Sequence, residues 1–288
     1  MPKFNSSSIS WNRKLSNGMA LGGITLAAAI VTAPLLFILG TVVYRGISGL
    51  DWAFFTHMPK PVDEPGGGMA NAIVGSGLIL LVASAIGIPF GIGTGVFLAE
   101  YGRNKYGNAV RFTADVLNGV PSIVIGLTAY ALVVVTQGHF SALAGGIALG
   151  IMMVPTVSRT TEEVLLLVPQ AVREAALGLG IPRWRTTISV VIRTASSGIV
   201  TGIMLAFARV AGETAPLMFT AFGNQFWNVN LNQPTAALPL QIYVYAISPF
   251  DEWHRQAWTA AFVLIALIAI SITLFRFATS RGVMKGAA

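Results

Sequence analysis

The sequence contains no cysteine and few charged residues. Among its 288 residues there is no Cys, and Asp, Glu, Lys and Arg together make up only 10%. The first absence excludes a secreted scaffold held by disulfides, and also any metal or iron–sulfur site built from thiolates. The second excludes an ordinary soluble domain, because such a domain carries about 25% charged residues to cover its surface.

Catalytic and nucleotide-binding motifs are also missing. The sequence has no G-x-x-x-x-G-K-[ST] stretch, so this chain cannot hold a nucleotide in a P-loop. Its three histidines, His57, His139 and His254, lie far apart in or beside predicted loops, and we expect no shared metal site. We therefore expect no catalytic residue and no cofactor bound by this chain.

Long apolar runs dominate the sequence. Hydrophobic residues make up 54% of it, and the mean hydropathy is +0.71. A helix needs roughly 20 apolar residues to cross a bilayer, and we predict an all-α integral membrane protein with six transmembrane helices. The fourth run is short, and a helix lying on the membrane surface is the alternative for it. The predicted spans are Met19–Tyr44, Ala72–Ala99, Phe112–Thr136, Leu143–Ser158, Thr194–Thr220 and Trp258–Phe275.

The positive residues sort to one side of these spans. With the N-terminus inside, the inside segments hold fourteen of the 18 Lys and Arg residues, the outside segments hold three, and Arg209 lies within the fifth span. This asymmetry follows the positive-inside rule and predicts that both termini are cytoplasmic. It accounts for the net charge of +7 without a nucleic-acid partner. The first run exceeds the about 7–15 apolar residues of a signal peptide, so we expect it to stay as an anchor.

The longest predicted inside segment runs from Arg159 to Arg193. Pro169 can begin a short helix there, Gly178 and Gly180 can end it, and Pro182 can open a second helix. We therefore predict a helix–break–helix unit at the membrane surface, outside the bilayer.

The first of these two helices carries small residues in a row. Ala175 and Ala176 would let the surface of a partner protein come close, and Glu174 offers a charge for a capping or bridging contact. An ordinary amphipathic linker is the alternative that the residues leave open.

Two opposite charges, Arg209 and Glu213, fall inside the fifth predicted span. Each costs about 2.5–3.5 kcal/mol near a helix centre on insertion scales, so such residues usually face a bundle interior or an aqueous path. On one helix the spacing of four places both on one face, although Arg before Glu is the weaker order for a pair. We expect partners on other helices or in a cavity, and a structural buried pair is the alternative. Asp115, near the start of the third span, is expected to have no special role.

Small residues and prolines within the spans have simpler interpretations. Gly87, Gly91 and Gly95 recur every four residues and predict close helix packing. Proline is common in transmembrane helices, and we interpret four prolines as kinks rather than sites. These are Pro34, Pro89, Pro121 and Pro155.

The inside segment resembles a known loop. Glu174-Ala175-Ala176, then Gly180 four residues on, then Val190-x-Ile192, is similar to the EAA loop of the permease subunits of bacterial ABC importers. The usual form is E-A-A-x3-G-x9-I-x-L-P. Here Val190 and Ile192 replace the Ile and Leu, and Arg193 stands in place of the final Pro.

Further stretches resemble one branch of that family, the permeases of phosphate-specific importers, from about residue 50 to the C-terminus. The sister permease of the same importers shares the A-R-x-x-G-E-T part of the pattern. The matching stretches are Leu98–Arg103, Pro121–Val124, Arg159–Glu162, Ala208–Pro216, Asn224–Trp227 and Pro65–Asn71.

The resemblance implies a type I ABC importer permease fold, similar to the methionine importer permease, in residues 69–281. It implies a coupling loop at about 159–193 in which Glu174, Ala175, Ala176 and Gly180 meet an ATPase dimer. The partners would be that ATPase, a second permease subunit, an extracytoplasmic phosphate-binding protein and membrane lipid. ATP and Mg²⁺ would bind the ATPase, and Arg209 and Glu213 would line the translocation path.

With this resemblance, the chain divides into six predicted parts and is expected in the bacterial cytoplasmic (inner) membrane. The parts are a cytoplasmic tail 1–18, a first helix 19–44, an external loop 45–70, the permease domain 69–281, its inner loop at about 159–193, and a cytoplasmic tail 282–288.

Three other functions compete with phosphate import. A stand-alone secondary transporter would usually show an internal repeat, and we find none. An intramembrane enzyme needs a cluster of titratable groups, and only Arg209 and Glu213 qualify. A permease for another oxyanion, such as sulfate or molybdate, stays open because an arginine does not distinguish between oxyanions.

Overall fold

The computed structural model describes residues 11–62, 64 and 66–285. In these residues the regular elements are all helices, joined by loops, and the one β contact is an isolated bridge between Phe222 and Thr235. This confirms the predicted all-α class. In chain order the elements are α1 (Trp11–Ile47), α2 (Trp52–Thr56), α3 (Ala70–Glu100), α4 (Lys105–Gly119), α5 (Ser122–Ala129), the π-helical η1 (Tyr130–Val134), α6 (Val135–Gln137), α7 (Ala142–Leu166), α8 (Gln170–Gly178), α9 (Arg183–Thr186), the π-helical η2 (Thr187–Val191), α10 (Ile192–Ala211), α11 (Ala215–Thr220), α12 (Leu238–Ala246) and α13 (Asp251–Lys285).

Five helical segments of the described chain are long and apolar enough to cross a membrane. A sixth candidate is the bent pair of α4 with the segment Ser122–Gln137. The six predicted spans are each represented, which supports the predicted number. The five segments are Leu15–Ile47, Ala70–Glu100, Ala142–Leu166, Arg183–Ala211 and Asp251–Phe277.

The third predicted span is wrong as a single helix, because the chain bends by 104° between α4 and α5. Val120 and Pro121 have extended backbone conformations, with ψ of 131° and 134°. Proline removes a helical hydrogen bond and pushes the preceding residue out of the helical region. The predicted kink at Pro121 is therefore a break in the helix.

The fifth predicted span, Thr194–Thr220, is also wrong as one helix. α10 ends at Ala211, residues 212–214 are not helical, and the short α11 follows. Gly212 occupies the C-terminal cap of α10, and Pro216 stands in the first turn of α11, where a missing N–H does no harm. Glycine favours the end of one helix and proline the start of the next.

The fourth predicted span is longer than the apolar run suggested. Instead of Leu143–Ser158, α7 covers Ala142–Leu166. In the most apolar 18-residue part of α7, 67% of the residues are buried inside the molecule. A helix on the membrane surface is therefore excluded, and the first residues of the predicted inner loop 159–193 belong to α7.

The predicted tails fall partly outside the described residues, which omit 1–10 and 286–288. Within the described part, α1 already begins at Trp11 and α13 continues to Lys285.

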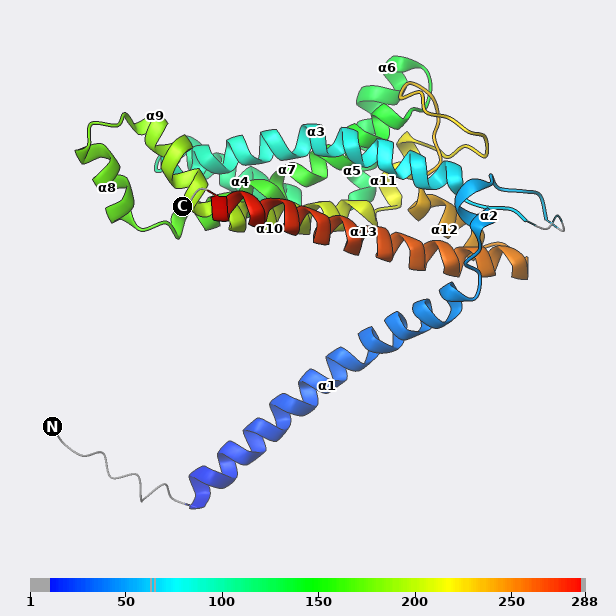
Figure 1. The fold of residues 1–288 in the computed structure, drawn as a ribbon, viewed down its shortest axis with the longest axis horizontal. Coiled ribbons are helices and arrows are strands. Elements are labelled where there is room, and N and C mark those ends of the chain that lie inside the picture. Colours follow the sequence, from blue (N-terminus) through cyan, green and yellow to red (C-terminus); the bar gives the residue numbers. More distant parts are fainter. Residues whose placement is uncertain (1–10, 63, 65, 286–288) are drawn as a thin grey trace.

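Most of the long helices run side by side along one axis (Figure 1). α8, α9 and the C-terminal end of α13 lie at one end of this bundle, and α2, α12 and α6 lie at the other. α1 packs against α13 and then diverges from the bundle (Figure 1). The predicted inner loop is therefore at one end, and the connections predicted to be external are at the other.

The core of the bundle is the seam between α3 and α7. The predicted close packing of small residues is confirmed there. A Cβ atom added at Gly91 would lie 2.6 Å from Cβ of Val157, and one at Gly87 would lie 2.6 Å from Cβ of Met153. At Gly95 the added atom would lie 2.6 Å from both the Ser158 carbonyl oxygen and Thr161 Cβ. The two backbones approach this closely because the glycines have no side chain.

This seam predicts opposite effects for two neighbouring glycines of α3. Gly91→Ala should destabilise the protein by about 1–3 kcal/mol, because the new methyl group overpacks the contact with Val157. Gly93→Ala is the matched control, since nothing lies within 4 Å of its added Cβ. It should be neutral or stabilise by up to about 1 kcal/mol through helix propensity. Thermal unfolding of the purified protein in detergent measures the stability of both variants. Equal effects of the two substitutions would contradict the close packing of α3 against α7 at Gly91.

Candidate functional site

α8 is the first helix of the predicted coupling unit, and its start is set by proline. Pro169 occupies the N-cap with φ −58° and ψ 140°, so the chain leaves α7 in an extended conformation and then turns into α8. Pro182 does the same before α9, with φ −65° and ψ 149°. The predicted helix–break–helix unit is therefore present in the structure.

Gly180 ends the first of these helices. It has a φ of +78°, in the left-handed region that favours glycine. Its N–H donates to the carbonyl of Leu177 at 2.9 Å, and the N–H of Ile181 donates to the carbonyl of Ala176 at 3.2 Å. These two bonds form a Schellman motif, which satisfies carbonyls that the helix end leaves free. The glycine four residues after Ala176 is thus needed for the sharp turn between α8 and α9.

The remaining predicted coupling residues divide between the two faces of α8. Glu174 and Ala175 are exposed, together with Ala171 and Gly178. Ala176 is buried, with 6% of its surface exposed. We call the exposed set Ala171, Glu174, Ala175 and Gly178 the outer face of α8. It is a small-residue surface that a partner could approach closely.

Arg173 fixes the opposite side of α8 to the ends of two membrane helices. Its Nε and Nη2 donate to Glu100 Oε1 at 3.1 and 2.8 Å. Its Nη1 and Nη2 also donate to the carbonyls of Val168 at 2.6 Å and Leu165 at 2.9 Å. The Val168 carbonyl lies just after the end of α7, where backbone carbonyls lack a helical partner, and the guanidinium supplies one. One side chain therefore joins α8, α3 and α7.

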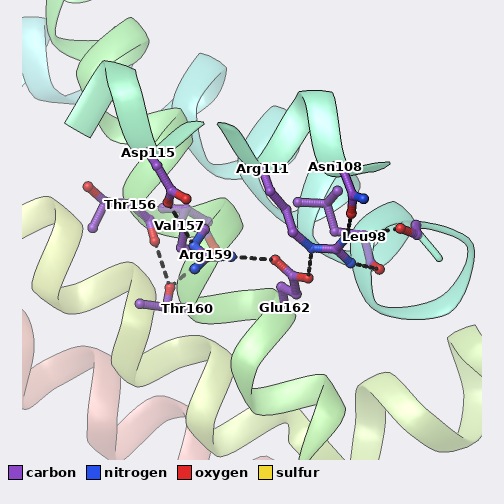
Figure 2. A network of polar contacts seen from close by, with 10 residues as sticks. Leu98, Asn108, Arg111, Asp115, Thr156, Val157, Arg159, Thr160 and Glu162 are labelled. Carbon is purple, nitrogen blue, oxygen red and sulfur yellow. Dashed lines mark hydrogen bonds and ion pairs between the residues drawn. The ribbon is translucent and has the colours of Figure 1, made fainter. Parts of the chain in front are cut away.

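A second ionic network joins α7 to α4, and Figure 2 shows it around Glu162. Glu162 is 3% exposed and accepts from Arg111 Nε at 2.6 Å and from Arg159 Nη1 at 3.1 Å. Arg111 also donates to the carbonyls of Leu98 at 3.0 Å and Gly102 at 2.9 Å, at the end of α3. A buried carboxylate needs partners of this kind, because desolvation penalises a lone charge.

Asp115, for which the sequence predicts no special role, lies at the exposed edge of this network. Its Oδ1 lies 3.1 Å from Arg159 Nε, in an ion pair between α4 and α7 (Figure 2). Sequence reasoning also missed Arg111, Glu162 and Glu100 as structural partners. Arg159 and Glu162 are three residues apart at the end of an apolar run, which is a local signal for a paired charge.

Arg209 and Glu213 do not share the face of one helix. Arg209 is in the last turn of α10, and Glu213 lies in the non-helical segment 212–214. Among the residues that the structure describes, neither side chain forms an ion pair or a hydrogen bond. Arg209 is exposed on this chain, and Glu213 is half-buried. The alternative of a structural buried pair within this chain is therefore contradicted.

At the other end of the bundle, two stretches that carry the resemblance meet. The side chain of Asn71 donates to the carbonyl of Asn224 at 2.8 Å. Ser76 Oγ accepts from the N–H of Leu238 at 2.7 Å, which fixes the start of α12 to α3. Of the stretch Pro65–Asn71, Pro65 lies outside the described residues.

Comparison with known proteins gives the family. A profile of the family described as binding-protein-dependent transport system inner membrane component matches residues 87–281. The phosphate transport system permease protein PstA of Yersinia pestis is 49% identical over 241 residues, which are 83% of this chain and 81% of that protein. The PstA protein of Xylella fastidiosa strain Temecula1 is 47% identical over 261 residues, or 90% of each chain.

A solved structure has the same fold. The MetNI methionine ABC transporter in an inward-facing form aligns with a TM-score of 0.56 and 18% identity, over 75% of this chain and 96% of that one. At this identity the likeness concerns the fold, and it confirms the predicted type I importer permease architecture. The profile match and the relatives at 47–49% identity show the family. This chain is a multi-pass inner-membrane permease that belongs to the family of binding-protein-dependent transport system inner membrane components.

Proposed function

We propose that the chain is the permease subunit of an ATP-driven importer that carries inorganic phosphate across the cytoplasmic membrane. Its relatives at 44–49% identity are named phosphate transport system permease proteins PstA, which supports phosphate as the substrate. The partners would be a PstC-like second permease, a PstB-like ATPase dimer and a PstS-like binding protein outside. Family membership excludes the alternative of a stand-alone secondary transporter.

ATP hydrolysis belongs to a partner in this proposal. The sequence has no P-loop, so ATP and Mg²⁺ would bind the ATPase subunits. The outer face of α8 is the surface that we assign to that contact. Its residues are mostly small and are exposed, and on the other side of the helix Arg173 donates to Glu100.

Motion of the ATPase would reach the membrane helices through ion pairs. Arg173 connects α8 to α3 and α7, and the network at Glu162 connects α7 to α4. Beyond the break at Pro121, α5 packs on α11, where an added Cβ at Gly126 would lie 2.7 Å from Pro216 Cα. α11 directly follows the non-helical segment next to Arg209. The coupling helix and the proposed path are therefore linked by continuous packing.

Arg209 is the residue that we assign to the translocation path. Non-helical backbone within a membrane is tolerated only where protein buries it or where it lines an aqueous cavity. Residues 212–214 are such a segment, and the exposed guanidinium of Arg209 lies beside it without a carboxylate partner in the described chain. Arginine stays charged at all relevant pH values and matches an oxyanion with two parallel donors. A second permease subunit would close the other side of this path.

The coupling assignment predicts the effect of a charge on the outer face of α8. Ala175→Asp should reduce phosphate uptake at least about tenfold, because an unpaired charge in a close contact costs more than the 1.4 kcal/mol that corresponds to that factor. The protein should still insert into the membrane, since the site lies outside the apolar spans. Ala175→Ser is the matched control and should keep uptake. Normal uptake and normal ATPase association in the aspartate variant would disprove the docking surface.

The path assignment predicts that Arg209→Gln abolishes phosphate uptake while the complex still assembles. Glutamine removes the charge that offsets the anion in a low-dielectric constriction. Glu213→Gln should be milder, because the guanidinium is kept. Uptake of labelled phosphate by membrane vesicles with the purified complex measures both variants, and an assembled Arg209→Gln complex with normal uptake would show that Arg209 is not in the path. If excess sulfate or molybdate blocked phosphate uptake, that result would instead favour a permease for another oxyanion.

A further inference from the structure

A cavity of about 550 Å³ lies behind α8, between the coupling unit and the ends of α3 and α7. Its walls are the C-terminal end of α3 with the residues after it, the connection from α7 to α8, the inner side of α8 and the start of α9. The α8 residues in its wall are Gln170, Arg173 and Leu177, which recur at helical spacing. They face away from the outer face of α8, so a ligand here would not occupy the proposed ATPase contact.

The cavity wall carries an excess of positive charge. Its one carboxylate, Glu100, is already bound by Arg173 at 2.8 Å. Two further arginines, Arg103 and Arg183, line the cavity and are exposed. In the described part of the chain, neither of their guanidinium groups has an ion pair or a side-chain hydrogen bond. By contrast, Arg111, Arg159 and Arg173 all bind carboxylates. The wall therefore offers two free guanidiniums to an anion.

Apolar side chains border the same cavity. Leu166 and Leu167 line it and are 52% and 81% exposed, and Tyr101 is 48% exposed. They stand where two membrane-spanning helices end, since α3 ends at Glu100 and α7 at Leu166. Aromatic and basic residues near the ends of membrane helices are typical of the membrane–water interface. A ligand that meets both parts of the wall has an anionic phosphate group and an apolar part.

We propose that this cavity binds the headgroup of an anionic phospholipid from the cytoplasmic leaflet. Arg103 and Arg183 would hold the phosphate, and the exposed leucines would contact the glycerol and upper acyl chains. Basic pockets between membrane helices on the cytoplasmic side bind such headgroups. The assignment of this cavity to the cytoplasmic side of the membrane rests on the proposed function, in which the ATPase binds α8 from the cytoplasm. A lipid here would bridge the segment after α3 to α9 and hold the coupling unit in place.

Native mass spectrometry of the purified complex tests the site, with phosphatidylglycerol and phosphatidylcholine of matched chains as probes. The wild-type complex should retain phosphatidylglycerol in preference to phosphatidylcholine. The double variant Arg103→Gln/Arg183→Gln should bind phosphatidylglycerol at least about tenfold more weakly, because two charge-assisted contacts are lost. The matched control is Lys105→Gln/Arg185→Gln, which changes the net charge equally at exposed positions that do not line the cavity. It should bind like the wild type.

Three results would overturn the proposal. They are equal retention of the two lipids by the wild type, equal loss in both double variants, and displacement of phosphatidylglycerol by millimolar inorganic phosphate, which would make the cavity a site for free phosphate. The lipid comparison on the wild type stays decisive if the cavity variant fails to assemble. The measurement needs no transport, so it is separate from the proposed function. A chain that binds the lipid but never co-purifies with an ATPase would instead refute the proposed function.

Discussion

One guanidinium connects the surface unit to the membrane part of this protein. Arg173 binds Glu100 and two carbonyls at the end of α7, with both charged side chains only 14% exposed. Charge-assisted hydrogen bonds of this kind are stronger where water is excluded. Val172, the residue before Arg173 in α8, packs against the apolar cluster that contains Leu165, Val168 and Val191. The ion pair and this apolar contact together hold the inner side of α8 against the ends of α3 and α7.

Most of the ionic contacts gather at one end of the bundle, and the Arg255–Glu252 pair at the start of α13 is the exception. The helix breaks at Pro121 and at residues 212–214 lie elsewhere along the bundle. Glu100, Asp115 and Glu162 all pair with arginines near the ends of α3, α4 and α7. Away from this end, contacts are made by small residues, such as Gly126 against Pro216 and Gly91 against Val157. Charges can pair firmly where helices reach the interface, whereas inside a bilayer close packing is the main source of contact. The bundle is thus held by two kinds of contact in two regions.

Local rules predicted the coupling unit because its elements are set by single residues. Pro169, Gly180 and Pro182 begin or end helices wherever they occur. The same rules, applied to Gly212 and Pro216, would have shown the end of α10, but the apolar run concealed it. The size of the bend at Pro121 depends on how α5 packs against α11, which no local pattern contains. The Arg173–Glu100 pair joins residues 73 positions apart, and one sequence gives no signal for such a contact.

The π-helical segment η2 lies at the junction of α9 and α10, within one continuous helical stretch from Arg183 to Ala211. A π turn holds one residue more than an α turn, and each residue of an α-helix turns the chain by about 100°. The surface half and the membrane half of this stretch are therefore out of phase by that angle. Consequently, the side chains of α9 are offset by that angle from the positions that a regular α-helix continuing from α10 would give them. Losing or gaining a single residue at η2 would turn α9 by about 100° about the helix axis relative to α10, against the anchor that Arg173 forms with Glu100.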